Sequence, residues 1–288
     1  MSIAYLNGDY LPQDEARISP MDRGFLFGDG VYEVIPVYQG VPFRLEEHLQ
    51  RLANSLAAIE LDNPLSDDAW CELFERLIEK NGGGNLGIYL QVTRGTAPKR
   101  DHAFPSPAVP GTVFAFTSPV ATPAADSPDT AEGAVAITLD DIRWSRCDIK
   151  STALLANVML KQQAIASGAS EAILVRDGFA TEGSASNFFI VEGGVVLTPP
   201  KSHLILPGVT RDLVVDLCHQ HNVPIKETEV TEGQLKAAEE IWLSSSTREL
   251  VPVVTLNGHA VGDGHPGPLW KTMARHYVDF KRRLCGAS

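Results

Sequence analysis

The chain has 288 residues, of which 44% are hydrophobic, so it can bury a sizeable core, and its length suggests about two domains. Its formal net charge is −12, from 24 Lys and Arg against 36 Asp and Glu. An acidic chain with no basic run is a poor match for nucleic acid or an anionic membrane surface, although a small anionic ligand needs only local cations.

The sequence gives no sign of export or of a metal centre. Its N-terminus lacks a basic segment followed by an apolar one, and no apolar stretch approaches the ~20 residues of a membrane span. The cysteines are scattered and form no C-x-x-C, which favours reduced thiols over a disulfide framework or a zinc site. They are Cys71, Cys147, Cys218 and Cys285. We therefore expect a cytoplasmic protein without a metal.

The chain begins with two predicted hairpins. Residues 3–11 turn at Asn7-Gly8, a pair typical of short turns because both positions need a positive φ. Residues 31–38 alternate like a strand and turn at Gln39-Gly40. Tyr32 and Glu33 therefore point to opposite faces of that strand, so that one can face a site while the other is structural or solvated.

Two amphipathic helices follow. Leucines at helical spacing predict a helix over 45–59, with Arg51 beside the apolar stripe, and Ser66 is placed to cap a second helix that ends at Gly82. Residues 82–87 satisfy G-x-G-x-x-G. They follow a helix and open the strand 88–93, whereas a dinucleotide fingerprint follows a strand and opens a helix, so we predict a turn instead.

A long loop over 94–111 concentrates positive charge in an otherwise acidic chain, at Lys99, Arg100 and His102. Loops of this length are often functional. The cluster is either a solvated loop tip or a trap for a substrate carboxylate, for which the arginine fork is well suited. A strand over 112–117 follows the loop.

We expect an α/β (α+β) protein of two domains. The Pro-, Ala- and Asp-rich residues 119–132 read as a linker between an N-terminal domain, 1–118, and a C-terminal domain, 133–288. The second half is predicted to contain a strand over 134–139, a helix over 153–166, hairpins over 172–181 and 188–198, a helix that starts near Thr210, a capping box at Thr231 and Gln234, strands over 241–243 and 252–256, and a helix over 269–284.

Lys150 lies where strand-type sequence gives way to helix-type sequence. A lysine held at such a junction can be partly desolvated, which lowers its pKa, and a neutral amine can form a Schiff base with a carbonyl. The alternative is an ordinary surface lysine. The residues further along favour the chemical role, because Glu182 and two hydroxyl- and glycine-rich turns are the parts that a pyridoxal phosphate (PLP) site requires.

Those turns offer an anion site. The helix that opens at Gly208-Val209-Thr210 presents backbone N–H groups and a positive dipole end, with Thr210 as its expected N-cap, and Ser245 and Ser246 can add hydroxyl donors. A plain polar strand end is the alternative for the serines.

The motifs together resemble the class IV, or fold type IV, PLP-dependent aminotransferases, most closely the D-amino-acid aminotransferases. The resemblance covers nearly the whole chain. It rests on F-G-D-G-V-Y-E (27–33), E-H-L-Q-R-L (47–52), V-T-R-G-T (92–96), D-I-R-W-S-R-C-D-I-K-S (141–151), T-E-G-S-A-S-N (181–187), P-G-V-T-R-D (207–212) and S-S-S-T-R-E (244–249).

The resemblance implies a role for each matching residue, with PLP in the cleft between the domains. Lys150 is the catalytic and cofactor-binding lysine, Glu182 faces the pyridine nitrogen and Leu206 packs against the ring. The phosphate of PLP is bound by Arg51, Val209, Thr210, Ser245 and Ser246. Tyr32, Arg100 and His102 grip the substrate carboxylate, with the last two reaching across from a partner subunit of a homodimer. An extra loop residue leaves Lys99 as an alternative to Arg100, and Arg248 is an additional cation with no family counterpart.

The implied reaction transfers the amino group of a D-amino acid, such as D-alanine, to a 2-oxo acid, such as 2-oxoglutarate, by a ping-pong PLP mechanism. Two alternatives share the fold: a branched-chain L-amino-acid aminotransferase and an aminodeoxychorismate lyase. A non-catalytic PLP-binding protein is an alternative of another class, and it would have no use for Lys150.

Overall fold

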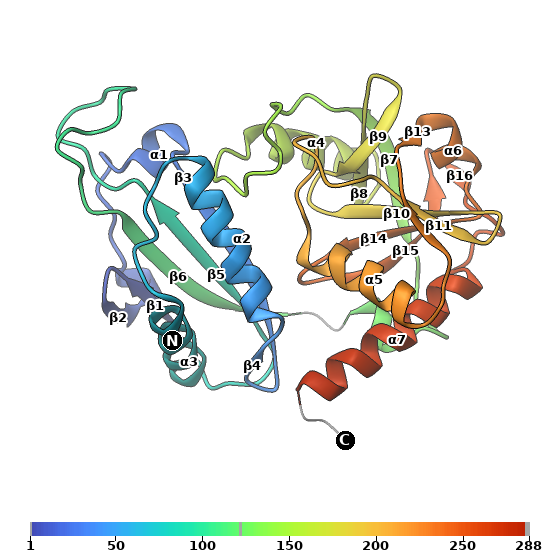
Figure 1. The fold of residues 1–288 in the computed structure, drawn as a ribbon, viewed down its shortest axis with the longest axis horizontal. Coiled ribbons are helices and arrows are strands. Elements are labelled where there is room, and N and C mark those ends of the chain that lie inside the picture. Colours follow the sequence, from blue (N-terminus) through green and yellow to red (C-terminus); the bar gives the residue numbers. More distant parts are fainter. Residues whose placement is uncertain (1, 121–122, 286–288) are drawn as a thin grey trace. The chain divides into compact units, whose positions relative to one another are not determined.

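The computed structural model describes residues 2–120 and 123–285, and the chain divides into two compact units (Figure 1). Unit 1 comprises Met1–Val120 together with Ile149–Leu154, and unit 2 comprises Ala121–Asp148 and Leu155–Ser288. The segment that contains Lys150 therefore packs with unit 1, although it lies far along the chain from the rest of that unit.

Six strands of the described part of unit 1 form one antiparallel sheet in the order β2-β1-β6-β5-β3-β4. Their bounds are β1 Ile3–Leu6, β2 Asp9–Pro12, β3 Gly30–Tyr38, β4 Val41–Pro42, β5 Leu86–Thr93 and β6 Thr112–Pro119. Asn7 and Gly8 both have positive φ, 50° and 108°, as the predicted first hairpin turn requires.

Helices cover the core of unit 1. The short helix α1 (Arg23–Phe27) precedes β3, and the amphipathic helices are α2 (Leu45–Ala58) and α3 (Asp67–Lys80). Ser66 caps α3 by accepting a hydrogen bond from the Ala69 N–H, as predicted. The apolar stripes of α2 and α3 join alternate residues of β3 in one buried cluster, which includes Leu52, Phe74 and Ile35.

Unit 2 is built on one long mixed sheet, in the order β12-β11-β10-β14-β15-β7-β8-β9-β13, with β16 paired to β15. Its strands are β7 Ala134–Asp140, β8 Glu171–Arg176, β9 Phe179–Gly183, β10 Asn187–Glu192, β11 Val195–Thr198, β12 Ile225–Glu227, β13 Val230–Thr231, β14 Glu240–Ser245, β15 Glu249–Leu256 and β16 His259–Ala260. Strands β7 and β8 run parallel and are linked through α4 (Leu155–Ala166).

The other helices of unit 2 are α5 (Val209–Gln220), α6 (Glu232–Ala237) and α7 (Pro268–Leu284). Thr231 and Gln234 form the predicted capping box of α6. The expected N-cap of α5 was wrong: Gly208 occupies the cap with extended backbone, and Thr210 lies inside the first turn. This change leaves the first N–H groups of α5 without a side-chain cap.

Both units combine helices and sheet, which confirms the predicted α/β (α+β) class. Residues 82–87 end α3 in a turn and lead into β5, so the rejection of a dinucleotide fingerprint was correct. Across residues 2–120 and 123–285, no helix is both long enough and apolar enough to cross a bilayer. The four cysteines are unpaired.

Candidate active site

Lys150 is held at the edge of the unit 1 sheet by its own backbone. Its carbonyl accepts a hydrogen bond from the Tyr32 N–H at 2.9 Å, and its N–H donates to Ser55 Oγ of α2 at 3.2 Å. Ser151 forms a β-bridge with Val31, and Ile149 is buried in the core of unit 1. Because Ile149 and Ser151 are both held in unit 1, the half-buried side chain of Lys150 extends from a fixed stretch of backbone.

The aromatic ring of Tyr32 lies beside the Lys150 amine. The Nζ atom is 4.1 Å from the ring centroid, within the range of a cation–π contact. Tyr32 also stacks on Tyr89 of β5, with centroids 5.8 Å apart. The structure therefore brings together two of the residues that the sequence assigned to one site.

Glu33 lies on the opposite face of β3, as the alternation predicted, and it holds Arg51 and His48 of α2. Arg51 Nε donates to Glu33 Oε1 at 2.8 Å and Nη2 donates to Oε2 at 2.7 Å, while His48 Nδ1 lies 2.7 Å from Oε2. Glu33 is 1% exposed and Arg51 6%. Arg51 is thus a buried cation that Glu33 holds in one orientation.

The charges in this cluster determine the protonation of Glu33 and His48. Burial alone would raise the pKa of Glu33, but the charge of Arg51 and the hydrogen bonds from Arg51 and His48 hold it well below its usual value. Burial lowers the pKa of His48 against the opposing effect of Glu33, and the positive charges of Arg51 and Lys150 lower it further. A neutral His48 beside an ionised Glu33 must carry its proton on Nδ1, since a carboxylate can only accept. Its Nε2 is then an acceptor.

In unit 2, Glu182 is buried at 4% exposure and lies within a ring of donors. Arg143 Nη1 donates to Oε1 in a very short contact, while the Leu206 N–H (3.0 Å) and Asn187 Nδ2 (3.1 Å) donate to Oε2. Burial raises the pKa of Glu182 to about 7, although Arg143 and the Leu206 N–H oppose the shift. The three donors hold this buried carboxyl group in one orientation.

Asp141 fixes the arginine that contacts Glu182. Its Oδ1 accepts from Arg143 Nε at 2.9 Å and its Oδ2 from Arg143 Nη2 at 2.9 Å. Arg176 and Thr181 also contact Asp141 Oδ2, each at 3.2 Å. The residues before Lys150 in the D-I-R motif thus orient the acid, a role that the sequence analysis did not assign. An acid and an arginine two residues apart, such as Asp141 and Arg143, occur too often in sequences to indicate that they orient a distant carboxylate.

The start of α5 lies against Glu182. Asn187 Nδ2 donates both to Glu182 and to the carbonyl of Leu206, at 2.9 Å. A Cβ atom on Gly208 would lie 2.0 Å from Asn187 Oδ1, so only glycine allows this approach. Asn187 therefore links Glu182 to Leu206 and to the start of α5.

The serines at the end of β14 complete this side. Ser245 and Ser246 are half-buried, and α5 packs against β14. Ser244 pairs with Asn187 across the strands, so the two side chains share a face, and Ser244 Oγ is buried with no hydrogen-bond partner among the described residues. A buried hydroxyl without a hydrogen-bond partner, near a helix start without a side-chain cap, is available to donate to a bound ligand.

Arg100 and His102 lie in the long loop and are exposed. Within the described part of unit 1, no hydrogen bond or ring contact joins either residue to Tyr32 or Lys150; both instead lie against Phe27. Lys99 is paired with Asp101 at 2.8 Å and points into solvent. Cys147 is a buried thiol, and burial raises its pKa to about 11.

Comparison with known proteins identifies the family of this chain. The family model described as amino-transferase class IV matches residues 30–256. This chain belongs to the class IV aminotransferases, which are PLP-dependent enzymes. The match includes the candidate residues of both units between Tyr32 and Ser246.

Individual relatives agree with this class IV assignment. The D-alanine aminotransferase of Bacillus licheniformis is 42% identical over 93% of this chain and 93% of its own length. That of Staphylococcus aureus (strain COL) is 40% identical over 97% and 98%. Among solved structures, the branched-chain aminotransferase of Thermoproteus uzoniensis has a TM-score of 0.87 and 26% identity, and the similarity covers 100% of this chain and 96% of that one.

The residues of this class IV chain fit its cofactor. PLP carries an aldehyde, a phosphate and a ring nitrogen. The chain offers an amine at Lys150, a start of α5 without a side-chain cap, a Ser244 hydroxyl with no hydrogen-bond partner among the described residues, and a buried acid at Glu182. The sequence predicted the lysine, the acid and the helix start, and it missed the supports that orient them: Glu33, His48, Asp141, Arg143 and Asn187. His48 could have been found, since it lies three residues before Arg51 on the same helix face.

Proposed function

We propose that this class IV aminotransferase transfers the amino group of a D-amino acid, such as D-alanine, to a 2-oxo acid, such as 2-oxoglutarate. The observation that carries the choice of substrate is the exposed Arg100 and His102 pair on the long loop, a cationic group suited to a carboxylate. The names of the D-alanine aminotransferases that are 38–42% identical to this chain support it.

We propose that the cofactor is bound by the residues assigned from the sequence. Lys150 supplies the amine, Glu182 accepts from the ring nitrogen and Leu206 packs on the ring. Arg51, Val209, Thr210, Ser245 and Ser246 hold the phosphate, and Tyr32, Arg100 and His102 hold the substrate carboxylate. The domain bounds 1–118 and 133–288, with the linker 119–132, belong to the same proposal.

When bound, PLP supplies an electron-withdrawing ring that makes the Cα–H bond of an attached amino acid acidic. The chain's own groups do the rest. Lys150 Nζ takes the proton from the substrate Cα, a positioned transfer typically worth ~10²–10⁴-fold. Arg51, held by Glu33, neutralises a phosphate, and Glu182, held by Arg143, stabilises positive charge on a ring nitrogen. Tyr32 packs beside the amine and limits the directions it can take.

The absorbance of the purified protein tests this function. We expect a visible band from bound PLP that disappears on addition of D-alanine and persists with L-alanine. Loss of the band with L-amino acids alone would favour the branched-chain alternative, which the structural likeness to branched-chain aminotransferases keeps open. No band even after PLP is added would remove the cofactor assignment.

We propose that the enzyme is a homodimer whose loops are shared. Helix α4 buries Leu160 and Ala164 on one side, yet its other side exposes Leu155 (74%), Val158 (61%) and Met159 (56%). A group of exposed apolar side chains on one side of a helix is typical of a surface that packs against a partner. A second copy of this chain is the partner that the site also lacks, because the chain's own Arg100 and His102 make no contact with Tyr32 or Lys150 among its described residues.

Complementation tests this arrangement. Lys150→Ala and Arg100→Ala proteins are each unfolded, mixed and refolded together. If the loop acts on the partner's site, each mixed dimer has one intact site, and mixing restores about a quarter of the wild-type activity. A loop that serves its own subunit gives no recovery. The unpaired cysteines support a cytoplasmic location, which we include in the proposal.

A further inference from the structure

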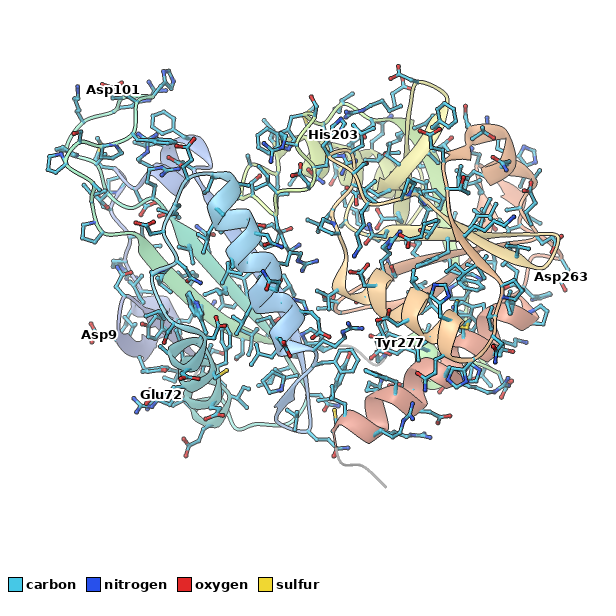
Figure 2. All side chains as sticks on the ribbon, viewed as in Figure 1. Asp9, Glu72, Asp101, His203, Asp263 and Tyr277 are labelled. Carbon is cyan, nitrogen blue, oxygen red and sulfur yellow. The ribbon has the colours of Figure 1, made fainter. Side chains whose placement is uncertain are left out.

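The buried side chain of Arg23 lies beneath the loop that carries Arg100 and His102. Its Nη1 donates to the carbonyls of Asp101 at 2.6 Å and Ala103 at 3.2 Å, and its Nη2 donates to the carbonyl of His102 at 3.3 Å. Arg23 is 3% exposed. One guanidinium thus binds three consecutive carbonyls at the outer end of the loop, where Asp101 is labelled in Figure 2.

The other side of Arg23 is anchored to the fold. Its Nε donates to Asp29 Oδ2 at 2.7 Å, and Arg94 Nε donates to the same oxygen at 2.9 Å. Arg94 in turn caps the end of α2 by donating to the carbonyls of Ile59 (2.6 Å) and Glu60 (3.0 Å). Asp29 therefore links the support of the loop to the helix that carries Arg51.

Helix α1 also supports the side chains of the loop. The Arg100 guanidinium lies 5.0 Å from the centroid of the Phe27 ring, and the His102 ring lies 5.4 Å from it. Arg23 lies 4.9 Å from the same centroid. Both carboxylate-binding candidates therefore share one aromatic surface, while their backbone is held by Arg23.

We propose that Arg23 is a positioning residue for substrate binding: it holds residues 101–103 so that Arg100 and His102 are ordered before the substrate carboxylate arrives. The inference rests on the proposed function and adds a residue to it. Ordering a long loop costs free energy, and a loop that is ordered in advance does not pay that cost on binding. Arginine suits the task because its planar fork reaches several acceptors at once, whereas lysine is a point charge.

Arg23→Lys tests the proposal, because lysine keeps the charge beside Asp29 and loses the fork. Arg17→Lys is the matched control, since Arg17 also donates to two carbonyls, those of Asp14 and Ala16, but is exposed and outside the site. The first readout is hydrogen exchange of the peptide over 97–105. We expect exchange there to be roughly tenfold faster in Arg23→Lys only, as local opening predicts. Unchanged exchange would overturn the proposal.

The second readout is a double-mutant cycle with Arg100→Ala. Arg23→Lys is expected to lower kcat/KM for D-alanine roughly tenfold, mainly through KM, and to have less than about a twofold effect once Arg100 is gone, because residues that act as a unit are not additive. Equal losses in both backgrounds would show a general structural role and contradict the inference. The loss of the PLP absorbance band of the wild type with D-alanine tests the proposed reaction. Failure of that reaction can therefore be distinguished from failure of the role proposed for Arg23.

A second variant covers the case in which Arg23→Lys does not fold. Phe27→Leu removes the ring beside Arg23, Arg100 and His102 and leaves the hydrogen bonds of Arg23 in place. It is expected to raise KM for D-alanine about threefold at a similar kcat, since only a weak cation–π contact is lost. An unchanged KM in a folded Phe27→Leu protein would count against the shared support.

Discussion

The Lys150 amine lies 4.1 Å from the centre of the Tyr32 ring, and the carbonyl of Lys150 accepts from the Tyr32 N–H. The lysine and its aromatic neighbour are therefore fixed to each other by backbone and side chain together. Any change to the amine should alter chemistry more than folding, because the half-buried side chain contributes little to the core.

Lys150→Ala is expected to reduce transamination of D-alanine by at least ~10²-fold, the typical contribution of a positioned proton-transfer group. The melting temperature should change little. The initial rate with D-alanine and 2-oxoglutarate is the measurement, and Lys236→Ala, at an exposed lysine paired with Glu232, is the control. Full activity in Lys150→Ala would end the assignment of this lysine.

Glu33→Gln is expected to destabilise the protein by about 3–5 kcal/mol, because it leaves the buried Arg51 without its carboxylate. Urea unfolding of both proteins at pH 7 measures the difference. A change smaller than about 1 kcal/mol would mean that Arg51 finds other partners as good.

The same pair predicts a pH dependence. The pKa of Glu33 is lower in the folded protein than the ordinary value of 4.5, so its stabilisation is present above that value and is lost as the pH falls below it. The stability of the wild type should therefore decrease more steeply between pH 5 and pH 3 (roughly the range over which free carboxyl groups titrate) than that of Glu33→Gln. If the stability of the two proteins changed with pH in the same way, the lowered pKa of Glu33 would be contradicted.

Glu182→Gln is expected to retain PLP while slowing removal of the Cα proton, since a glutamine cannot offset positive charge on the ring nitrogen. A loss of roughly 10²-fold in the single-turnover rate with D-alanine is expected for an interaction made mainly in the transition state. Glu192→Gln, at an exposed acid in the same unit that accepts from Gln234, is the control. An unchanged rate would refute the role at the ring.

The sequence was sufficient for the elements and for residues whose chemistry is local. Strand alternation placed Tyr32 and Glu33 on opposite faces, helical spacing predicted α2, and both were confirmed. The class IV membership followed from motifs spread over the chain, and the family match confirmed it. Periodicity and turn chemistry act over a few residues, which is why they can be read directly.

What the sequence could not show are contacts between distant segments. Nothing near Arg23 indicates that its guanidinium meets carbonyls of residues 101–103, and nothing near Asn187 indicates Leu206. Such pairings depend on how the strands register in the sheet. The predicted N-cap of α5 failed for a local reason. Glycine is about as good an N-cap as threonine, and the close approach of Asn187 requires glycine at position 208.

Gly208→Ala tests that close approach. A Cβ at this position would lie 2.0 Å from Asn187 Oδ1, so the side chain of Asn187 or the start of α5 must shift. Since Asn187 donates to both Glu182 and Leu206, the shift should disturb the acid and the proposed phosphate turn together. We expect PLP affinity to fall at least tenfold (about 1.4 kcal/mol), measured by equilibrium titration of the apoprotein.

Gly233→Ala is the matched control, because a Cβ there has only Thr231 Oγ1 nearby, at 3.9 Å. Gly233 lies within α6, where alanine is the better helix former, so this variant should gain about 0.5–1 kcal/mol of stability and bind PLP normally. Unchanged PLP affinity in Gly208→Ala would show that the start of α5 tolerates displacement, and the phosphate would then have to be held chiefly by other groups, such as Arg51 and the serines of β14.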